Sequence, residues 1–318
     1  MKIIKRIALT VVAIIIVVIV GILAIFSYRN ANYYKLVKTD KPLEAQYTAL
    51  GPYKVSYQEF DSENEAFKKN EIWYPSEIKE SASALPLVIM ANGTGITASK
   101  YKAVFKHLAS WGFIVVGNED ENSRTGASSS ASLNFMLSLN EDNTSDFYGK
   151  IDVDNIGIGG HSQGGVGTIN AVTMQDNGSY FKAMYTASTT SSFWGQENQL
   201  GTDWSYDVSK VNIPYFMVAG TGSFDAGTAE DITATEGQGI TPLWSLQKNY
   251  AEIPDTVTKI MARRVNTDHG DMLTHADGYM TAWFMYWLKG DTQAGDVFFG
   301  DDAELLANEN WQDVMRSQ

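Results

Sequence analysis

Residues 157–167 read Gly-Ile-Gly-Gly-His-Ser-Gln-Gly-Gly-Val-Gly, and residues 160–164 within them have the Gly-x-Ser-x-Gly spacing of a nucleophile elbow. In such a turn a serine lies between a strand and a helix, and small flanking residues let these two elements approach closely. The flanks have this character, because residues 152–159 alternate like a strand and residues 164–174 can form a helix. The stretch therefore predicts an exposed serine hydroxyl at a strand-to-helix junction.

Two other structures share part of this glycine pattern. A glycine-rich turn could close a strand and leave Ser162 merely solvated. A dinucleotide-binding turn needs Gly-x-Gly-x-x-Gly after a first strand and a later acid for the ribose, and no such arrangement can be laid over these residues. We therefore favour the elbow.

Strand-like and helix-like stretches alternate along most of the chain. The pattern predicts strands over residues 53–60, 71–74, 87–91, 113–117, 152–159, 183–187, 214–219 and 256–265, and helices over 100–111, 130–139, 164–174, 243–251 and 278–289. This order is typical of the α/β-hydrolase fold, a mostly parallel twisted sheet flanked by helices. Only about 25 residues separate the strand ending at Ala187 from the one beginning near Ile213, so we expect no large cap domain.

The N-terminus has the pattern of a membrane segment. Residues 7–26 contain no charged side chain, and a helix of this length, at about 1.5 Å per residue, matches a hydrocarbon core of roughly 30 Å. Lys2, Lys5 and Arg6 precede it, and by the positive-inside rule they keep the N-terminus in the cytoplasm. We expect an uncleaved single-pass anchor with the catalytic domain outside. A cleaved signal peptide, which would secrete the domain, is the alternative.

These features divide the chain into a membrane anchor over residues 1–29, a polar connector over 30–52 and one α/β-hydrolase catalytic domain over 53–318. With 24 Lys and Arg against 37 Asp and Glu, the formal net charge is −13, which disfavours nucleic acid as a partner. The chain has no cysteine, which excludes disulfides and a lipoprotein anchor. We expect a monomer stabilised by packing.

A serine needs a general base to act as a nucleophile, and the chain has four histidines. His269 follows the last predicted strand, where the α/β-hydrolase order of serine, acid and histidine places the base. His275, six residues later, is the alternative. We expect His107 to be a surface or packing residue of a helix, and His161, next to Ser162, to line the pocket floor or pack.

The acid that orients the base is expected after the strand over residues 214–219. Asp225 is the first carboxylate in that loop, and it would hold the imidazole and stabilise its charged form. Glu230 and Asp231 are the alternatives, and all three could instead be solvated loop residues.

Attack on a carbonyl group also requires N–H donors for the oxygen that becomes negative. One is expected from Gln163, at the N-terminus of the helix that follows the serine. The second is expected from the turn over residues 92–97, because its glycines at 93 and 95 suit a turn that presents backbone amides. The same glycines would equally suit a structural bend.

From about residue 86 to 300 the chain resembles the cutinase-like polyesterases, the poly(ethylene terephthalate) hydrolase type, and related α/β-hydrolases such as chlorophyllases. Besides the elbow, the matching stretches are Gly-Ile-Thr-Ala at 95–98, Leu-Ala-Ser-Trp-Gly-Phe-Ile-Val-Val at 108–116, Tyr-Gly-Lys-Ile-Asp at 148–152 and Trp-Leu-Lys-Gly-Asp-Thr at 287–292. The resemblance implies Ser162, Asp225 and His269 as a catalytic triad. It also implies the backbone amides of Ile96 and Gln163 as an oxyanion hole.

The chain departs from this family at several positions. Thr189 and Thr190 stand where the family often has a tryptophan, and Trp194 is nearby. The elbow holds His161 and Gln163 instead of the usual aromatic residue and methionine. The C-terminal disulfide that is common in these enzymes has no counterpart here.

Together these features predict a serine carboxylesterase that acts outside the cytoplasmic membrane on small-molecule or polymer-bound esters through an acyl-enzyme. We expect Gly95, His161 and Trp194 to contribute to substrate binding. We expect no cofactor. We also expect no metal, because His269 and His275 are six positions apart and no third ligand cluster accompanies them. A cell-envelope glycan deacetylase or acyltransferase is one alternative, and a non-catalytic binding module on the same fold is another.

Overall fold

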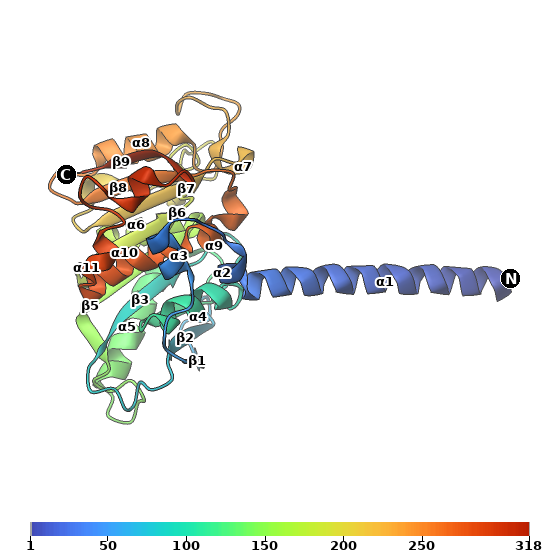
Figure 1. Ribbon diagram of the computed structural model, residues 1–318, viewed down its shortest axis with the longest axis horizontal. Helices are drawn as coiled ribbons and strands as arrows, with labels where there is room; N and C mark the ends of the chain where they lie inside the picture. The colour runs from blue at the N-terminus through green and yellow to red at the C-terminus, as the bar shows by residue number, and fades with distance from the viewer. Residues whose placement is uncertain (1, 318) are drawn as a thin grey trace.

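A nine-stranded sheet forms the centre of the molecule (Figure 1). The computed structural model describes residues 2–317, without the side chains of residues 2–10, 13, 26 and 30. Across the sheet the strands follow the order β1-β2-β4-β3-β5-β6-β7-β8-β9. Their bounds are β1 Val55–Asp61, β2 Lys69–Pro75, β3 Leu85–Ala91, β4 Ile114–Asn118, β5 Ile151–His161, β6 Phe181–Ala187, β7 Tyr215–Gly220, β8 Lys259–Arg264 and β9 Trp311–Arg316.

The sheet is parallel in its centre and antiparallel at its edges. The six strands from β4 to β8 in this order pair in parallel, whereas β1, β2 and β9 form antiparallel pairs. β7 is buried along its whole length, because both faces of a central parallel strand are covered. β1 has no buried residue and mixes polar with apolar side chains, as expected for an edge strand.

Helices cover both faces of the sheet. α4 (Lys102–Ser110) and α10 (Asp277–Lys289) contribute to one buried cluster, and α5 (Ala127–Glu141), α6 (Gln163–Met174) and α8 (Leu243–Glu252) contribute to the other. Alternate residues of β3 enter the two clusters, so the clusters lie on opposite faces of the sheet. The shorter α-helices are α2 Tyr33–Leu36, α3 Pro42–Thr48, α7 Ser223–Ala226, α9 Met272–His275, α11 Thr292–Gly295 and α12 Glu304–Ala307.

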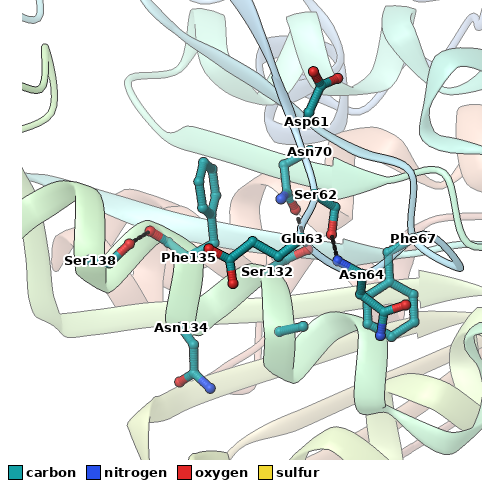
Figure 2. A pocket seen from close by; sticks show the side chains of 11 residues that line it. Asp61, Ser62, Glu63, Asn64, Phe67, Asn70, Ser132, Asn134, Phe135 and Ser138 are labelled. Atoms are coloured by element: carbon teal, nitrogen blue, oxygen red, sulfur yellow. Dashed lines mark hydrogen bonds between the residues drawn. The ribbon is translucent and has the colours of Figure 1, made fainter.

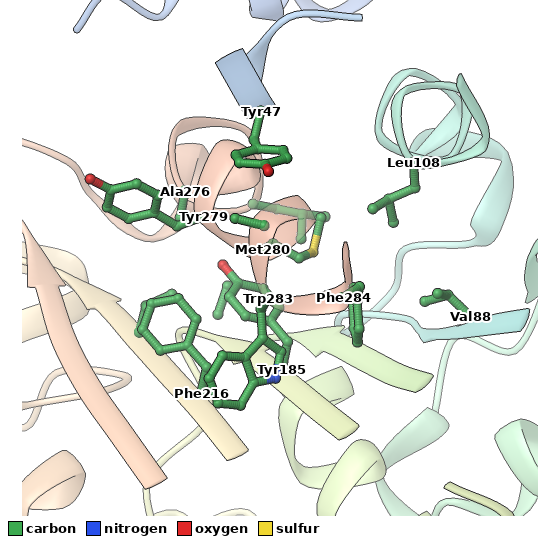
Figure 3. Close-up of a cluster of buried hydrophobic side chains, with 14 of the residues drawn as sticks. Tyr47, Val88, Leu108, Tyr185, Phe216, Ala276, Tyr279, Met280, Trp283 and Phe284 are labelled. Atoms are coloured by element: carbon green, nitrogen blue, oxygen red, sulfur yellow. The ribbon is translucent and has the colours of Figure 1, made fainter. Parts of the chain in front are cut away.

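Aromatic side chains fill the cluster beneath α10 (Figure 3). Trp283 of α10 packs against Phe216 of β7 with ring centroids 5.6 Å apart, and its indole N–H donates to the backbone oxygen of Met184 at 3.0 Å. Aromatic pairs of this kind add about 0.5–1.5 kcal/mol to the stabilisation from burial alone. The contact fixes α10 against β6 and β7, two of the strands from which the functional loops emerge.

Part of the segment expected to be a connector packs firmly against the domain. Glu44 of α3 accepts hydrogen bonds from Arg264 at 2.5 Å, from the Asn308 amide at 2.9 Å and from the Trp311 indole at 3.0 Å. The exposed fraction of Glu44 is 1%. Removing one partner of such a buried ion pair costs about 3–5 kcal/mol, so this contact ties α3 strongly to β8 and β9.

His107 was expected to be either a surface residue or a packing residue, and the structure shows that it is a packing residue. It is fully buried in α4, with Nδ1 2.7 Å from the Asp277 carboxylate and Nε2 near the backbone oxygens of Thr48 and Ala49. Burial opposes protonation of the imidazole, but the charge of Asp277 outweighs it and raises the pKa of His107. The contacts connect α4 with α10 and with the end of α3.

α1 (Lys2–Ala31) is one continuous helix that projects away from the domain (Figure 1). A helix that spans a bilayer needs about 20 consecutive, predominantly apolar residues. In the part of the chain that the structure describes, no helix combines the length and the apolar character needed to cross a membrane. The predicted span over residues 7–26 is therefore unsupported. The orientation inferred from Lys2, Lys5 and Arg6 concerns side chains outside the described residues.

The mixed α/β architecture with its mostly parallel sheet confirms the predicted fold class. Between β6 and β7 the chain forms only the short 3-10 helices η4 (Thr202–Trp204) and η5 (Val208–Lys210), with no cap domain over residues 188–214. The sequence analysis missed β9. Its residues, Trp-Gln-Asp-Val-Met-Arg, do not alternate between polar and apolar, since an edge strand is only partly buried.

Candidate active site

Ser162 stands at the turn between β5 and α6 in a strained backbone conformation. Its φ is 60° and its ψ is −122°, a combination that costs of order 1–3 kcal/mol for a residue with a side chain. A Cβ atom at Gly160 would lie 2.2 Å from the carbonyl oxygen of Gly164, and one at Gly164 would lie 2.2 Å from that of Ala91. Only glycine fits at these two positions, so the backbone has the form that the sequence spacing predicts.

Three side chains from separate loops form a hydrogen-bonded row. The Ser162 hydroxyl donates to Nε2 of His269 at 2.9 Å, and the Nδ1–H group of His269 donates to Oδ1 of Asp225 at 3.0 Å. Ser162 follows β5, Asp225 lies in α7 after β7, and His269 begins the 3-10 helix η6 (His269–Asp271) after β8. The carboxyl ends of parallel strands meet at one edge of a sheet, which brings these distant positions together.

Asp225 is buried and fully hydrogen-bonded. Its exposed fraction is 0%, and Oδ2 accepts from the Ser188 hydroxyl and from the backbone N–H of Gly220, each at 2.6 Å. With His269 on Oδ1, three donors compensate the carboxylate for its loss of water. Sequence reasoning missed Ser188, whose only signal was its position directly after β6.

Asp268 holds the loops after β7 and β8 together. Its carboxylate accepts from the backbone N–H groups of Phe224 at 3.2 Å, Asp225 at 2.8 Å and His269 at 2.8 Å. Burial opposes the charged form of Asp268, but the backbone donors outweigh it and lower the pKa of the carboxyl. Sequence reasoning also missed this residue, although Asp directly before a helical turn is a common capping pattern.

The alternative base and acids lie outside the row. Nδ1 of His275 is 3.4 Å from the Thr267 hydroxyl, and burial lowers the pKa of His275. Glu230 and Asp231 are exposed, and Asp231 accepts from the backbone N–H of Thr233 at 2.7 Å. Among residues 2–317 no group of three or more His, Asp or Glu side chains is arranged to hold a metal ion.

The two backbone amides expected as oxyanion donors differ in their hydrogen bonding. The N–H group of Gln163 is in the first position of α6, where a helix has no internal acceptor for it. The N–H group of Ile96 donates to the carbonyl oxygen of Gly93 at 3.2 Å. The hydroxyl of Tyr101 in turn accepts from the N–H group of Gly93 at 3.0 Å, which holds this turn after β3 in place.

A cavity of about 250 Å³ lies near the row, and its lining includes His161 and Gly270, the chain neighbours of Ser162 and His269. Most of its wall is apolar, because α4 contributes Ala103 and Val104 and α9 contributes Leu273. The remaining lining residues are Ile96, Lys100, Tyr101, His161, Gly270 and Thr274. The cavity is large enough for a short apolar group.

His161 lies in the wall of this cavity and contacts the backbone of His269. Its Nε2–H group donates to the carbonyl oxygen of His269 at 2.8 Å, and the two imidazole centroids are 4.7 Å apart. Burial, together with the charge that His269 can carry, lowers the pKa of His161 to about 4. His161 is therefore neutral at pH 7 and acts as an uncharged wall.

Gly95 and Trp194, expected beside the substrate, do not line this cavity. Gly95 has a φ of 65°, and its N–H group donates to the carbonyl oxygen of Glu121 at 3.1 Å. The indole of Trp194 donates to the carbonyl oxygen of Gly239 at 3.0 Å and packs on Phe193. Of the three residues expected at the substrate, the structure places only His161 in the cavity.

The strand order and the strained serine turn at the carboxyl edge of the sheet define the molecule as an α/β-hydrolase. The model of the PET hydrolase-like family matches residues 32–310, and the chain belongs to this family. This match confirms the resemblance found in the sequence and indicates a hydrolase of ester substrates. The chain has no significant match among curated proteins.

Replacing His161 with glutamine is expected to weaken the dependence of stability on pH. In the unfolded chain the imidazole has a pKa of about 6.5, so between that pH and about 4 the unfolded state binds more protons than the folded state. The unfolding free energy of the unmodified protein should therefore fall more steeply than that of His161→Gln as the pH drops through this range. Urea unfolding at several pH values checks this, and parallel curves would contradict it.

Proposed function

We propose that the protein is a serine carboxylic-ester hydrolase in which Ser162, His269 and Asp225 form the catalytic triad. The observation that carries this proposal is the unbroken row of hydrogen bonds from the Ser162 hydroxyl through His269 to Asp225, at 2.9 and 3.0 Å. A serine hydroxyl within hydrogen-bond distance of an oriented imidazole is the arrangement that activates this nucleophile.

In the proposed reaction, Ser162 Oγ attacks the carbonyl carbon of the ester while its proton passes to Nε2 of His269. The tetrahedral intermediate collapses when the protonated His269 gives this proton to the leaving alcohol, and an acyl-enzyme remains. A water molecule then attacks the acyl carbon, with His269 again as base, and the acid and free Ser162 are released. Asp225 keeps its negative charge throughout and stabilises the imidazolium.

The oxyanion is proposed to bind between the N–H groups of Gln163 and Ile96. The Gln163 donor lies at a helix N-terminus, where the helix dipole also favours negative charge. The Ile96 donor must exchange its bond to the Gly93 carbonyl for one to the oxyanion. Both donors follow a strand at the same edge of the sheet as Ser162.

Ser162→Ala is expected to abolish measurable hydrolysis of short p-nitrophenyl esters, and Asp225→Asn to lower kcat by about 10³–10⁴-fold, because the imidazole then loses its charged partner. Labelling with a fluorophosphonate probe should also be lost in Ser162→Ala. Ser223→Ala is the matched control, since Ser223 is exposed and takes no part in the hydrogen bonds of the row, and it should keep full activity. Retained turnover or labelling in Ser162→Ala would overturn the proposal.

The cavity beside the serine is proposed to hold the acyl group. An apolar space of about 250 Å³ without a cap domain favours short or polymer-bound acyl groups over long free lipids. His161 is uncharged and α4 and α9 contribute mainly apolar side chains, so Lys100 is the one charged residue in the described lining of the cavity.

Ala103→Trp should fill this cavity from α4 and lower kcat/KM for p-nitrophenyl butyrate by at least about tenfold relative to the acetate, because the longer chain loses its apolar contacts. Lys106→Trp, on the exposed side of the same helix, is the control and should leave the ratio of the two esters unchanged. An unchanged ratio in Ala103→Trp would place the acyl group elsewhere.

We further propose that the catalytic domain acts outside the cytoplasm. Support comes from the sequence, where three basic residues precede the uncharged stretch over residues 7–26. In cells that express the full chain, a membrane-impermeant fluorophosphonate should label the protein without lysis, and Ser162→Ala should stay unlabelled. Labelling that requires lysis of spheroplasts would place the domain in the cytoplasm.

A further inference from the structure

A second cavity lies on another part of the molecule, between the loop that joins β1 to β2 and the side of α5 (Figure 2). Its volume is about 600 Å³, within the range of about 300–1,000 Å³ that is typical of small-molecule sites. Residues 61–70 supply one wall and residues 131–138 supply the other. The two cavities share no lining residue.

Asn70 and Ser132 are the buried polar residues in the described lining of this cavity. The exposed fraction of Asn70 is 5%, and its Oδ1 accepts from the Ser132 hydroxyl at 2.7 Å, which itself accepts from the Asn118 amide at 3.0 Å. No described residue accepts from the Nδ2 group of Asn70, although Asn70 lines the cavity. The Nδ2 atom is not fully buried, so it can donate to water or to an acceptor atom of a ligand in the cavity.

The rim offers acceptors and donors together. Asp61 and Glu63 are exposed carboxylates that form no ion pair with any described residue. Asn64 and Asn134 use their side-chain oxygens within the protein, accepting from the N–H group of Ala66 and from the Asn177 amide, which leaves their NH₂ groups as donors. A metal ion or an ammonium group would use only the acceptors, and a phosphate only the donors. A hydroxyl group uses both.

Two phenyl rings add flat apolar surface between these polar groups. Phe67 and Phe135 line the cavity (Figure 2) and are half-buried. Phe135 packs against Phe60 with ring centroids 5.5 Å apart. A pyranose ring has hydroxyl groups around its edge and C–H groups on its faces. It therefore matches polar side chains that surround a flat apolar ring.

We propose that this cavity binds a short neutral oligosaccharide, a function beyond ester hydrolysis. Hydroxyl groups would donate to Asp61 and Glu63 and accept from the amides of Asn64, Asn70 and Asn134, while a sugar face lies on Phe135. Asn70 is paired with Asn118, the last residue of β4, so it lies near the edge of the sheet that carries Ser162. β2 is three strands from β5, or roughly 14 Å at about 4.8 Å per strand.

Isothermal titration of the full chain with neutral tetrasaccharides of glucose, N-acetylglucosamine and xylose tests this proposal. At least one should bind, and the double variant Glu63→Ala/Asn134→Ala should weaken binding by at least about tenfold, since both exposed side chains line the cavity. Glu65→Ala is the matched control, because Glu65 is exposed in the same loop but does not line the cavity, and it should bind normally.

Protein with Ser162 blocked by a fluorophosphonate should bind the sugar equally well. Without this block, the unmodified protein, the double variant and Glu65→Ala should hydrolyse p-nitrophenyl acetate at the same rate. These two results separate the second cavity from the proposed catalytic site. The proposal is overturned if no neutral tetrasaccharide binds, or if the double variant binds as well as Glu65→Ala. It is also overturned if fully deacetylated chitotetraose or tetragalacturonate binds more tightly than every neutral sugar, because the ligand would then be recognised by charge.

Discussion

The strained backbone of Ser162 is the constraint on which the functional part of the molecule depends. A φ of 60° with a ψ of −122° persists only where the surroundings leave no alternative. Here β5 enters the turn and α6 leaves it, and the close contacts at Gly160 and Gly164 allow no side chain between them. The turn also presents the first N–H group of α6 beside the serine. The positions of the proposed nucleophile and of the proposed oxyanion donor Gln163 are thus consequences of one local geometry.

Asp225 and His269 lie in loops that are hydrogen-bonded to each other. Asp268 accepts from backbone N–H groups of both the Asp225 loop and its own loop, so the loops that carry Asp225 and His269 are held together. Ser188, after β6, adds a third loop through its bond to Asp225. The aromatic packing of α10 on β6 and β7 provides the rigid base for these loops. Together these contacts hold the side chains of Asp225 and His269 in position.

The sequence predicts those parts of this structure that follow from steric rules or from strand order. The glycine spacing around Ser162 requires the turn, continuous apolar runs mark the central strands, and chain order directs attention to Asp225 and His269. The sequence does not predict Asp268 and Ser188, because their roles depend on hydrogen bonds between loops, which leave no periodic pattern in the sequence. β9 is not predicted, because polar and apolar residues need not alternate in a half-buried edge strand. The position of Trp194 is set by its bond to Gly239, 45 residues away, which no local signal encodes.

The proposed oxyanion site would bind the negatively charged transition state of the reaction more strongly than the neutral ester substrate. Of the two expected donors, Gln163 N–H has no acceptor inside its helix, whereas Ile96 N–H is satisfied by the carbonyl of Gly93 at 3.2 Å. A bond of that length between neutral groups is weak, and a bond to an oxyanion is shorter and roughly twice as strong. The exchange is therefore favourable only after negative charge has developed on the substrate. A donor that is occupied until that moment adds little to the binding of a neutral ester, so its contribution falls mainly on the rate of the chemical step.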